Sequence, residues 1–168
     1  MITNKKHLVI EKPWVHNKKN TSKVIKLCRL NKVKIFIHFE FIFLKKLKKL
    51  DTQKKIEAVH LDFLNKQKKQ SRVPKKQEFC SHLMAIKLLY FANIKKCTFN
   101  FGYHLKKNIR RVVIKYKNKF KIIDYSKTNE DIIGKFIRFV ENSINKNQKN
   151  YLDLKFASRV NHELKKIN

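Results

Sequence analysis

Glycine is nearly absent from this chain of 168 residues, which contains only Gly102 and Gly134. A P-loop and a dinucleotide-binding turn each need several closely spaced glycines, and a KH module needs a paired-glycine clamp. Two glycines that lie so far apart in the sequence cannot build any of these loops. We therefore expect neither nucleotide hydrolysis nor nicotinamide chemistry, and we expect no cofactor.

Cysteine is also scarce, and its spacing argues against a structural metal site. Cys28, Cys80 and Cys97 are three in number and widely separated, which does not suit a secreted disulfide framework. A zinc site would have to combine Cys80, His82, Cys97 and His104. Only one residue separates Cys80 from His82, whereas finger motifs place two to four residues between paired ligands. The thiols are thus expected to be buried or incidental, and no metal site is predicted.

Long apolar runs are missing as well. The most apolar run, from Ile35 to Leu44, spans about ten residues and contains His38 and Glu40, whereas a membrane span needs about twenty. The N-terminus has neither the Arg/Ser character of a transit peptide nor the continuous apolar segment of a secretory signal. We expect no membrane insertion, and we expect that the protein is made inside the organelle where it works.

Acidic residues are few: 12 Asp and Glu stand against 42 Lys and Arg, and the formal net charge is +30. Apolar residues make up 42% of the chain, so it contains enough material for a core and is not a simple disordered polycation. A compact body with this charge repels itself unless an anionic partner covers it. The composition therefore predicts a polyanionic partner.

The basic residues are 36 lysines and only 6 arginines, and the chain also contains 18 isoleucines and 16 asparagines. These favoured residues have A/T-rich codons, which indicates a strongly A/T-rich gene such as those of organelle genomes. Arg suits bidentate phosphate and base contacts better than Lys. The excess of Lys therefore suggests genomic bias at electrostatic positions, without base-specific recognition.

Hydrophobic spacing predicts an α+β fold, in which a small mixed sheet is packed by helices, with a basic N-terminal extension and a C-terminal helix. We divide the chain into a basic extension (1–32), an α/β RNA-binding core (33–145), and a polar linker with a C-terminal helix (146–168). The expected strands are Val33–Phe43, Cys97–Tyr103, Ile109–Tyr116 and Phe120–Tyr125; the expected helices are Leu44–Gln70, Glu78–Asn93, one after Asp131, and Tyr151–Ile167.

The segment from Glu78 to Asn145 has the expected order helix, three strands, helix, which resembles the topology of a double-stranded RNA-binding domain. The glycine-containing turns of that family are absent, and the last helix opens with Asn129-Glu130-Asp131 in place of a lysine cluster. Phe99, Phe101 and Tyr103 share one face of a strand, where either core packing or base stacking explains them.

Lysine-rich segments are the candidate binding sites, because unpaired lysines that contact phosphates release counterions. The densest mixed patch runs from Lys106 to Arg111 and is the best candidate for structured phosphate binding; a solvated charged face is the alternative. The predicted RNA-binding residues are Lys5, Lys6, Lys18, Lys19, Lys45, Lys46, Lys48, Lys49, Lys75, Lys76, Lys106, Lys107, Arg110 and Arg111.

The sequence contains few combinations of residues that are typical of a catalytic site. His60 and Asp62 are close in sequence, but in the helix expected there they lie on different faces. Asp124, Glu130 and Asp131 form the one acidic cluster, and helix capping accounts for the last two. No spacing specifies converging carboxylates on a metal, so we do not expect an enzyme.

In its high Lys, Asn and Ile content, small α/β core and basic ends, the chain resembles organelle-encoded ribosomal proteins. The resemblance implies a structural constituent of a mitochondrial ribosome, with the small subunit slightly favoured. The implied partners are ribosomal RNA and neighbouring ribosomal proteins, with no small-molecule substrate, and the implied location is the mitochondrial matrix. Two alternatives stay open: a stand-alone RNA- or DNA-binding factor, and a basic peripheral protein on an anionic membrane.

Overall fold

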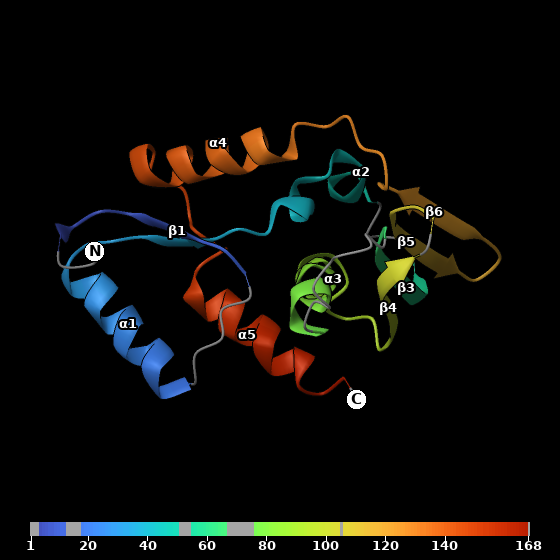
Figure 1. Ribbon diagram of the computed structural model, residues 1–168, viewed down its shortest axis with the longest axis horizontal. Helices are drawn as coiled ribbons and strands as arrows, with labels where there is room; N and C mark the ends of the chain where they lie inside the picture. The colour runs from blue at the N-terminus through green and yellow to red at the C-terminus, as the bar shows by residue number, and fades with distance from the viewer. Residues whose placement is uncertain (1–3, 13–17, 51–54, 67–75, 105, 168) are drawn as a thin grey trace. The chain divides into compact units, whose positions relative to one another are not determined.

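The computed structural model describes residues 4–12, 18–50, 55–66, 76–104 and 106–167 (Figure 1). The chain divides into two compact units. The first unit combines Met1–Glu40 with Asp131–Asn168, and the second unit is Phe41–Glu130. Each unit has its own sheet, so each is described by itself.

The first unit is built on two short parallel strands, β1 (Leu8–Ile10) and β2 (Ile35–Ile37), which pair from Leu8↔Ile35 to Ile10↔Ile37. Parallel strands cannot be joined by a tight turn, and here the crossover contains the helix α1 (Lys18–Leu30). All three residues of β2 are buried. Strands buried on both faces are typical of parallel sheets.

Two further helices of the first unit, α4 (Ile132–Asn145) and α5 (Leu154–Leu164), pack against opposite faces of this pair (Figure 1). Phe36 meets Phe139 of α4 edge-on, with ring centroids 6.1 Å apart. Phe39 meets Phe156 of α5 in the same way at 5.7 Å. The burial of these aromatic rings holds β2 between two helical layers.

The second unit is a four-stranded sheet with the order β4-β3-β5-β6. Strands β3 and β4 are parallel and are connected through α3, whereas β3–β5 and β5–β6 are antiparallel. The 3-10 helix η2 (Glu40–Phe43) and the short helix α2 (Lys45–Lys48) precede the sheet. The bounds of the other elements are β3 (Ile56–Lys66), α3 (Lys76–Tyr90), β4 (Lys96–His104), β5 (Ile109–Tyr116) and β6 (Phe120–Asp124).

The two faces of this sheet differ because side chains alternate along a strand. Leu61 of β3, Ile114 of β5, and Leu83 and Ile86 of α3 are fully buried and form the core. The opposite face carries polar side chains from three strands: His60, Asp62, Thr98, Asn100 and Arg111.

The predicted α+β class with a C-terminal helix is confirmed. The hairpin of β5 and β6, the strand β4, and the helices α3, α4 and α5 all form where their hydrophobic spacing predicts them. The resemblance to a double-stranded RNA-binding domain is wrong, because β4 pairs with β3 and not with β5.

The helix predicted over Leu44–Gln70 is wrong, since only four residues form α2 and Ile56–Lys66 is a strand. Val59, Leu61 and Phe63 are buried at a period of two, as in a strand. The same segment also contains apolar residues at helical spacing, and that spacing was the basis of the helix prediction. The strand predicted over Val33–Phe43 shrinks to β2 followed by η2.

The segment 1–32, expected to be a basic extension, contains β1 and α1, and the predicted division at residues 32 and 145 stays a prediction. Within the described ranges, no helix is long and apolar enough to cross a membrane. Over the same residues, no three His, Cys, Asp or Glu side chains gather as metal ligands.

Candidate functional site

Each unit contains a cluster of interacting polar side chains that combines a carboxylate with a histidine. We call Glu11, Lys12, His38 and Glu40 of the first unit the lysine cluster. We call His60, Asp62, Thr98, Asn100 and Arg111 of the second unit the sheet cluster.

The lysine cluster lies at the carboxyl ends of the two parallel strands. Glu11 and Lys12 follow β1 directly, His38 follows β2, and Glu40 comes two residues later. Because parallel pairing brings these ends together, residues 28 positions apart become neighbours. In open parallel sheets, ligands bind outside the carboxyl ends of the strands.

The centre of the lysine cluster is the Lys12 ammonium. Its Nζ lies 3.2 Å from Glu11 Oε2 and 3.2 Å from Glu40 Oε2, and the Lys12 side chain is only 14% exposed. An ammonium has three N–H donors. Among the described residues these two carboxylates use two of them, which leaves one donor for an oxygen atom of a bound molecule.

His38 completes the lysine cluster, with Nδ1 2.6 Å from Glu11 Oε1 and Nε2 3.7 Å from Glu40 Oε2. Partial burial raises the pKa of the Glu11 carboxyl, but the hydrogen bond with His38 and the charge of Lys12 outweigh it and lower the pKa. Glu11 therefore stays ionised at neutral pH and holds the side chains of Lys12 and His38 in place.

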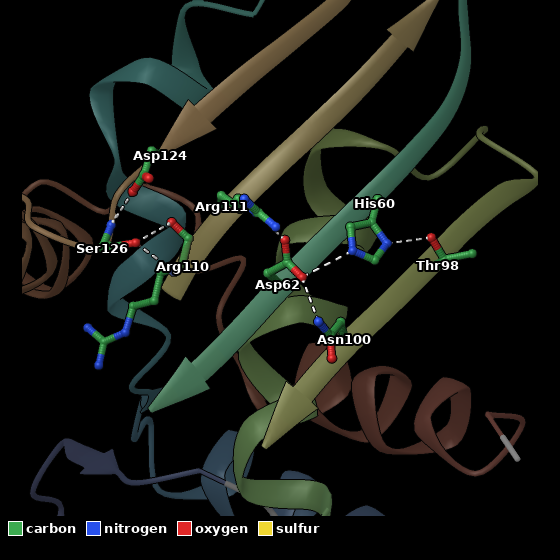
Figure 2. Close-up of polar contacts among 8 residues, drawn as sticks. All are labelled: His60, Asp62, Thr98, Asn100, Arg110, Arg111, Asp124 and Ser126. Atoms are coloured by element: carbon green, nitrogen blue, oxygen red, sulfur yellow. Dashed lines mark hydrogen bonds and ion pairs between the residues drawn. The ribbon is translucent and has the colours of Figure 1, made fainter. Parts of the chain in front are cut away.

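The sheet cluster is centred on the carboxylate of Asp62, which is completely buried (Figure 2). Its Oδ2 accepts a short hydrogen bond from Arg111 Nε, and its Oδ1 lies 2.9 Å from Asn100 Nδ2 and 3.1 Å from His60 Nε2. His60 Nδ1 in turn lies 2.7 Å from Thr98 Oγ1. The result is a continuous chain of contacts from Arg111 to Thr98.

Strand register explains the sheet cluster. His60 and Asp62 are two residues apart on β3 and share a face; Thr98 and Asn100 are their register partners on β4. The prediction that His60 and Asp62 lie on different faces of a helix is therefore wrong. Burial raises the pKa of Asp62, but hydrogen bonds from Arg111, Asn100 and His60 outweigh it, so the pKa lies below its usual value.

The predicted RNA-binding residues are distributed over several elements of both units. Lys106 and Lys107 are exposed between β4 and β5, whereas Arg110 lies over the rings of Phe41 and Phe63 at 5.0 and 4.8 Å. Arg111 pairs with Asp62. On and beside α2, the exposed lysines are Lys45, Lys46, Lys48 and Lys49. In the first unit, Lys5, Lys6 and Lys19 are exposed. Lys18 is the first residue of α1, Lys76 is the first residue of α3, and Lys75 lies outside the described residues.

Of the four residues weighed as zinc ligands, Cys80 and His82 are buried in the core, whereas Cys97 and His104 are half-buried on β4. Cys80 is fully buried in α3, and burial raises the pKa of the Cys97 thiol to about 11. His82 is stacked on the ring of Phe63, with centroids 5.2 Å apart. Phe99 and Phe101 pair in register with Leu61 and Phe63, on the face that packs against α3, which favours core packing over base stacking.

Comparison with known proteins identifies the fold. No protein-family model and no curated protein matches the chain. Solved structures do match it. The UDP-N-acetylglucosamine 3-dehydrogenase GnnA from Acidithiobacillus ferrooxidans has a TM-score of 0.76 at 13% identity, covering 96% of this chain and 69% of that protein.

Two further matches are of the same kind. The WlbA dehydrogenase from Bordetella pertussis, solved with NADH and UDP-GlcNAcA, has a TM-score of 0.73 at 13% identity, covering 97% of this chain and 68% of that one. KijD10, a 3-ketoreductase from Actinomadura kijaniata solved with NADP and TDP-benzene, has a TM-score of 0.71 at 11% identity, covering 98% and 70%. Likeness at this level of identity shows that the chain shares its fold with these oxidoreductases.

These matches contradict the predicted function. The predictions of a ribosomal structural protein, of ribosomal RNA and ribosomal proteins as partners, and of no enzymatic role or small-molecule substrate are wrong, because the structures that share this fold are dehydrogenases and reductases. Composition does not identify the function of this chain, because net charge bears on solubility and non-specific association and not on fold. The scarcity of glycine excludes the glycine-rich loop that binds a dinucleotide pyrophosphate. It does not exclude the other parts of an oxidoreductase fold, which do not need that loop.

A nicotinamide cofactor, as bound by two of these matches, does not fit the residues of this chain. A dinucleotide pyrophosphate is held by a turn with three closely spaced glycines at a helix N-terminus. Here Gly102 lies inside strand β4, and Gly134 lies within α4 beside its capping residue Asp131. These 168 residues therefore hold no such cradle, and we assign them no step that involves the cofactor.

Proposed function

We propose that the chain forms the substrate-handling part of an oxidoreductase that acts on a sugar nucleotide. The observation that carries the proposal is the fold likeness over 96 to 97% of the chain to two enzymes, one named as acting on a sugar nucleotide and one solved with one. The lysine cluster supports it, because it places a proton donor at the carboxyl ends of parallel strands.

Lys12 is the residue that handles the proton in this proposal. Its free N–H donates a hydrogen bond to the substrate oxygen that changes between hydroxyl and carbonyl. When a hydride donor that these residues do not hold reduces the carbonyl carbon, Nζ passes its proton to that oxygen; when the hydroxyl is oxidised, the hydride leaves to the same acceptor and Nζ takes the proton back. Glu11 and Glu40 hold the ammonium in position, and His38 fixes the orientation of Glu11.

The lysine-rich surface has a role in the same proposal. A sugar nucleotide carries a diphosphate, and a net charge of +30 attracts it from solution and raises the rate of encounter. Exposed lysines such as Lys45, Lys46, Lys106 and Lys107 supply this field. Localisation in a mitochondrion stays a prediction from composition.

Isothermal titration of the 168-residue protein with UDP-N-acetylglucosamine tests the proposal. We expect saturable binding that Lys12→Met weakens by about ten- to a hundredfold, because a hydrogen bond from a charged donor contributes about 1.5–3 kcal/mol. The matched control is Lys23→Met, which removes one exposed positive charge from α1. Its affinity should stay within about twofold of the unmodified protein.

Two results would overturn the proposal. One is the absence of saturable binding by protein that circular dichroism shows to be folded. The other is equal weakening by Lys12→Met and Lys23→Met, since that outcome assigns the whole effect to net charge and none to the lysine cluster.

A further inference from the structure

The sheet cluster contains a hydroxyl, an imidazole and a buried carboxylate in series (Figure 2). Thr98 Oγ1 lies 2.7 Å from His60 Nδ1, and His60 Nε2 lies 3.1 Å from Asp62 Oδ1. Hydroxyl, imidazole and carboxylate linked in this order are the components of a hydrolase triad, which is recognised by geometry and not by sequence position.

The charge state of Asp62 decides which nitrogen of His60 carries the proton. Asp62 is ionised, and an ionised carboxylate only accepts hydrogen bonds. His60 must therefore donate from Nε2–H to Asp62, which leaves the lone pair of Nδ1 facing Thr98. In neutral His60, this nitrogen accepts the hydrogen bond from the Thr98 hydroxyl, the arrangement in which imidazole acts as a general base.

Thr98 is not required for the stability of the buried carboxylate. Arg111, Asn100 and His60 already supply Asp62 with three donors. Thr98 lies on the far side of His60 and is exposed on the edge strand β4. Its hydroxyl is thus available to a molecule that approaches from solvent.

A cavity of about 480 Å³ opens beside these two residues. His60 and Thr98 line it together with Lys96 from β4, Lys115 from β5 and the exposed ring of Phe120 from β6. This volume lies in the range of small-molecule sites. Three lysines, with Lys95 the third, and an aromatic ring suit a ligand with an anionic group and an apolar part.

We propose that this cavity is an acyl-transfer site, with Thr98 as nucleophile, His60 as general base and Asp62 as the positioning residue. The substrate class is an ester that carries an anionic group. The proposal concerns the second unit alone and goes beyond the oxidoreductase function, so either one stands if the other fails.

The chemistry balances without a further reagent. Thr98 Oγ1 forms a bond to the acyl carbon while its proton moves to His60 Nδ1. The tetrahedral intermediate then breaks its bond to the leaving alcohol, which takes the proton from His60. Water next attacks the acyl-threonine with His60 again as base, which releases the carboxylic acid and restores the Thr98 hydroxyl. Lys96 and Lys115, which line the same cavity, are the nearest candidates for charge that stabilises the oxyanion, and Lys115 also pairs with Glu57 at 3.7 Å.

The test uses the full chain and p-nitrophenyl acetate. We expect rapid release of p-nitrophenolate with acetyl found on Thr98 by peptide mass spectrometry. Thr98→Val and His60→Gln should each lower the rate about a hundredfold or more, the range lost when a general base or its nucleophile is removed. Thr98→Ser, which keeps a hydroxyl, should retain the reaction. Thr128→Val removes a threonine hydroxyl elsewhere and serves as the matched control.

The substrate class has its own comparison, since 4-acetoxybenzoate carries a carboxylate and 4-acetoxybenzamide does not. 4-Acetoxybenzoate should transfer its acetyl group to Thr98 faster than 4-acetoxybenzamide does. Equal rates would overturn the assignment of an anionic ester as the substrate class. Three results would overturn the site itself: no p-nitrophenolate release by folded protein, the same rate in Thr98→Val, or acetyl found on lysines alone. Because Thr98 is exposed, Val there leaves the core intact, and Thr98→Ser provides a second folded reference.

Discussion

The burial of Asp62 is the clearest residue-scale feature of the second unit. Moving an unpaired carboxylate out of water costs several kcal/mol, and partners with good geometry offset that cost. Arg111 provides the opposite charge, while Asn100 and His60 occupy the other oxygen. The Arg111 side chain is 44% exposed, so it reaches from solvent to the buried acid. Removing Arg111 leaves Asp62 buried with an uncompensated charge.

We therefore expect Arg111→Met to lower the free energy of unfolding by about 3 kcal/mol, measured by urea denaturation at pH 7. The matched control is Arg138→Met, because Arg138 pairs with Asp131 at 3.6 Å between two exposed side chains. Breaking a surface pair of this kind costs less than about 1 kcal/mol. Equal losses in the two variants would contradict the role given to the buried carboxylate.

The same comparison depends on pH. A carboxyl group whose pKa is lowered in the folded state stabilises the protein above its unfolded pKa, and this contribution disappears as pH falls through the folded pKa. Asp62 belongs to this class. The difference between wild type and Arg111→Met should therefore shrink as the pH is lowered below about 4.

At the scale of elements, helix α5 shows how a local signal and a tertiary contact combine. Asp153 is its N-cap, and the carboxylate accepts a hydrogen bond of 2.9 Å from the backbone N–H of Phe156. Phe156 in turn packs edge-on against Phe39. The cap and the aromatic contact therefore stabilise the same first turn of the helix.

Replacing this cap gives an element-scale prediction. Asp153→Ala should destabilise the protein by about 1 kcal/mol, since one helix N–H loses its side-chain acceptor, and thermal unfolding measures the loss. Asp153→Asn, which retains an oxygen acceptor, should recover most of the stability. Equal destabilisation by Ala and Asn would show that charge matters here and not the cap.

At the scale of the whole molecule, the net charge of +30 acts on both stability and binding. Like charges on a compact body repel one another, and salt screens them with a Debye length of about 10 Å at 0.1 M. The same screening weakens the attraction of the chain for anions.

Raising the NaCl concentration from about 50 mM to about 500 mM should therefore increase the temperature of unfolding and weaken the binding of UDP-N-acetylglucosamine. Differential scanning calorimetry and isothermal titration measure the two effects. Stability that falls with salt would mean that attractive ion pairs outweigh the repulsion. Affinity that does not change with salt would remove the proposed role of the lysine-rich surface.

Prediction from sequence succeeded where contacts are local. The hairpin of β5 and β6 and the amphipathic helix α4 follow from spacing and turn residues within a few positions. It failed for β3, where Ile56, Val59 and Phe63 fit a helical stripe while Val59, Leu61 and Phe63 fit an alternating strand. Pairing with β4 and β5 on both sides selects the strand, and that pairing is not visible in the segment itself.

Sequence alone determined the charge, the α+β class and the absence of a glycine-rich phosphate cradle from these residues, since composition and local spacing suffice for each. Tertiary structure decided both sites. Glu40 reaches Lys12 only because β1 and β2 are parallel neighbours, and Thr98 reaches His60 only through the register of β3 with β4. Such contacts join residues far apart in the chain, and hydrogen-bonded strand pairing, which local hydrophobic patterns do not encode, brings them together.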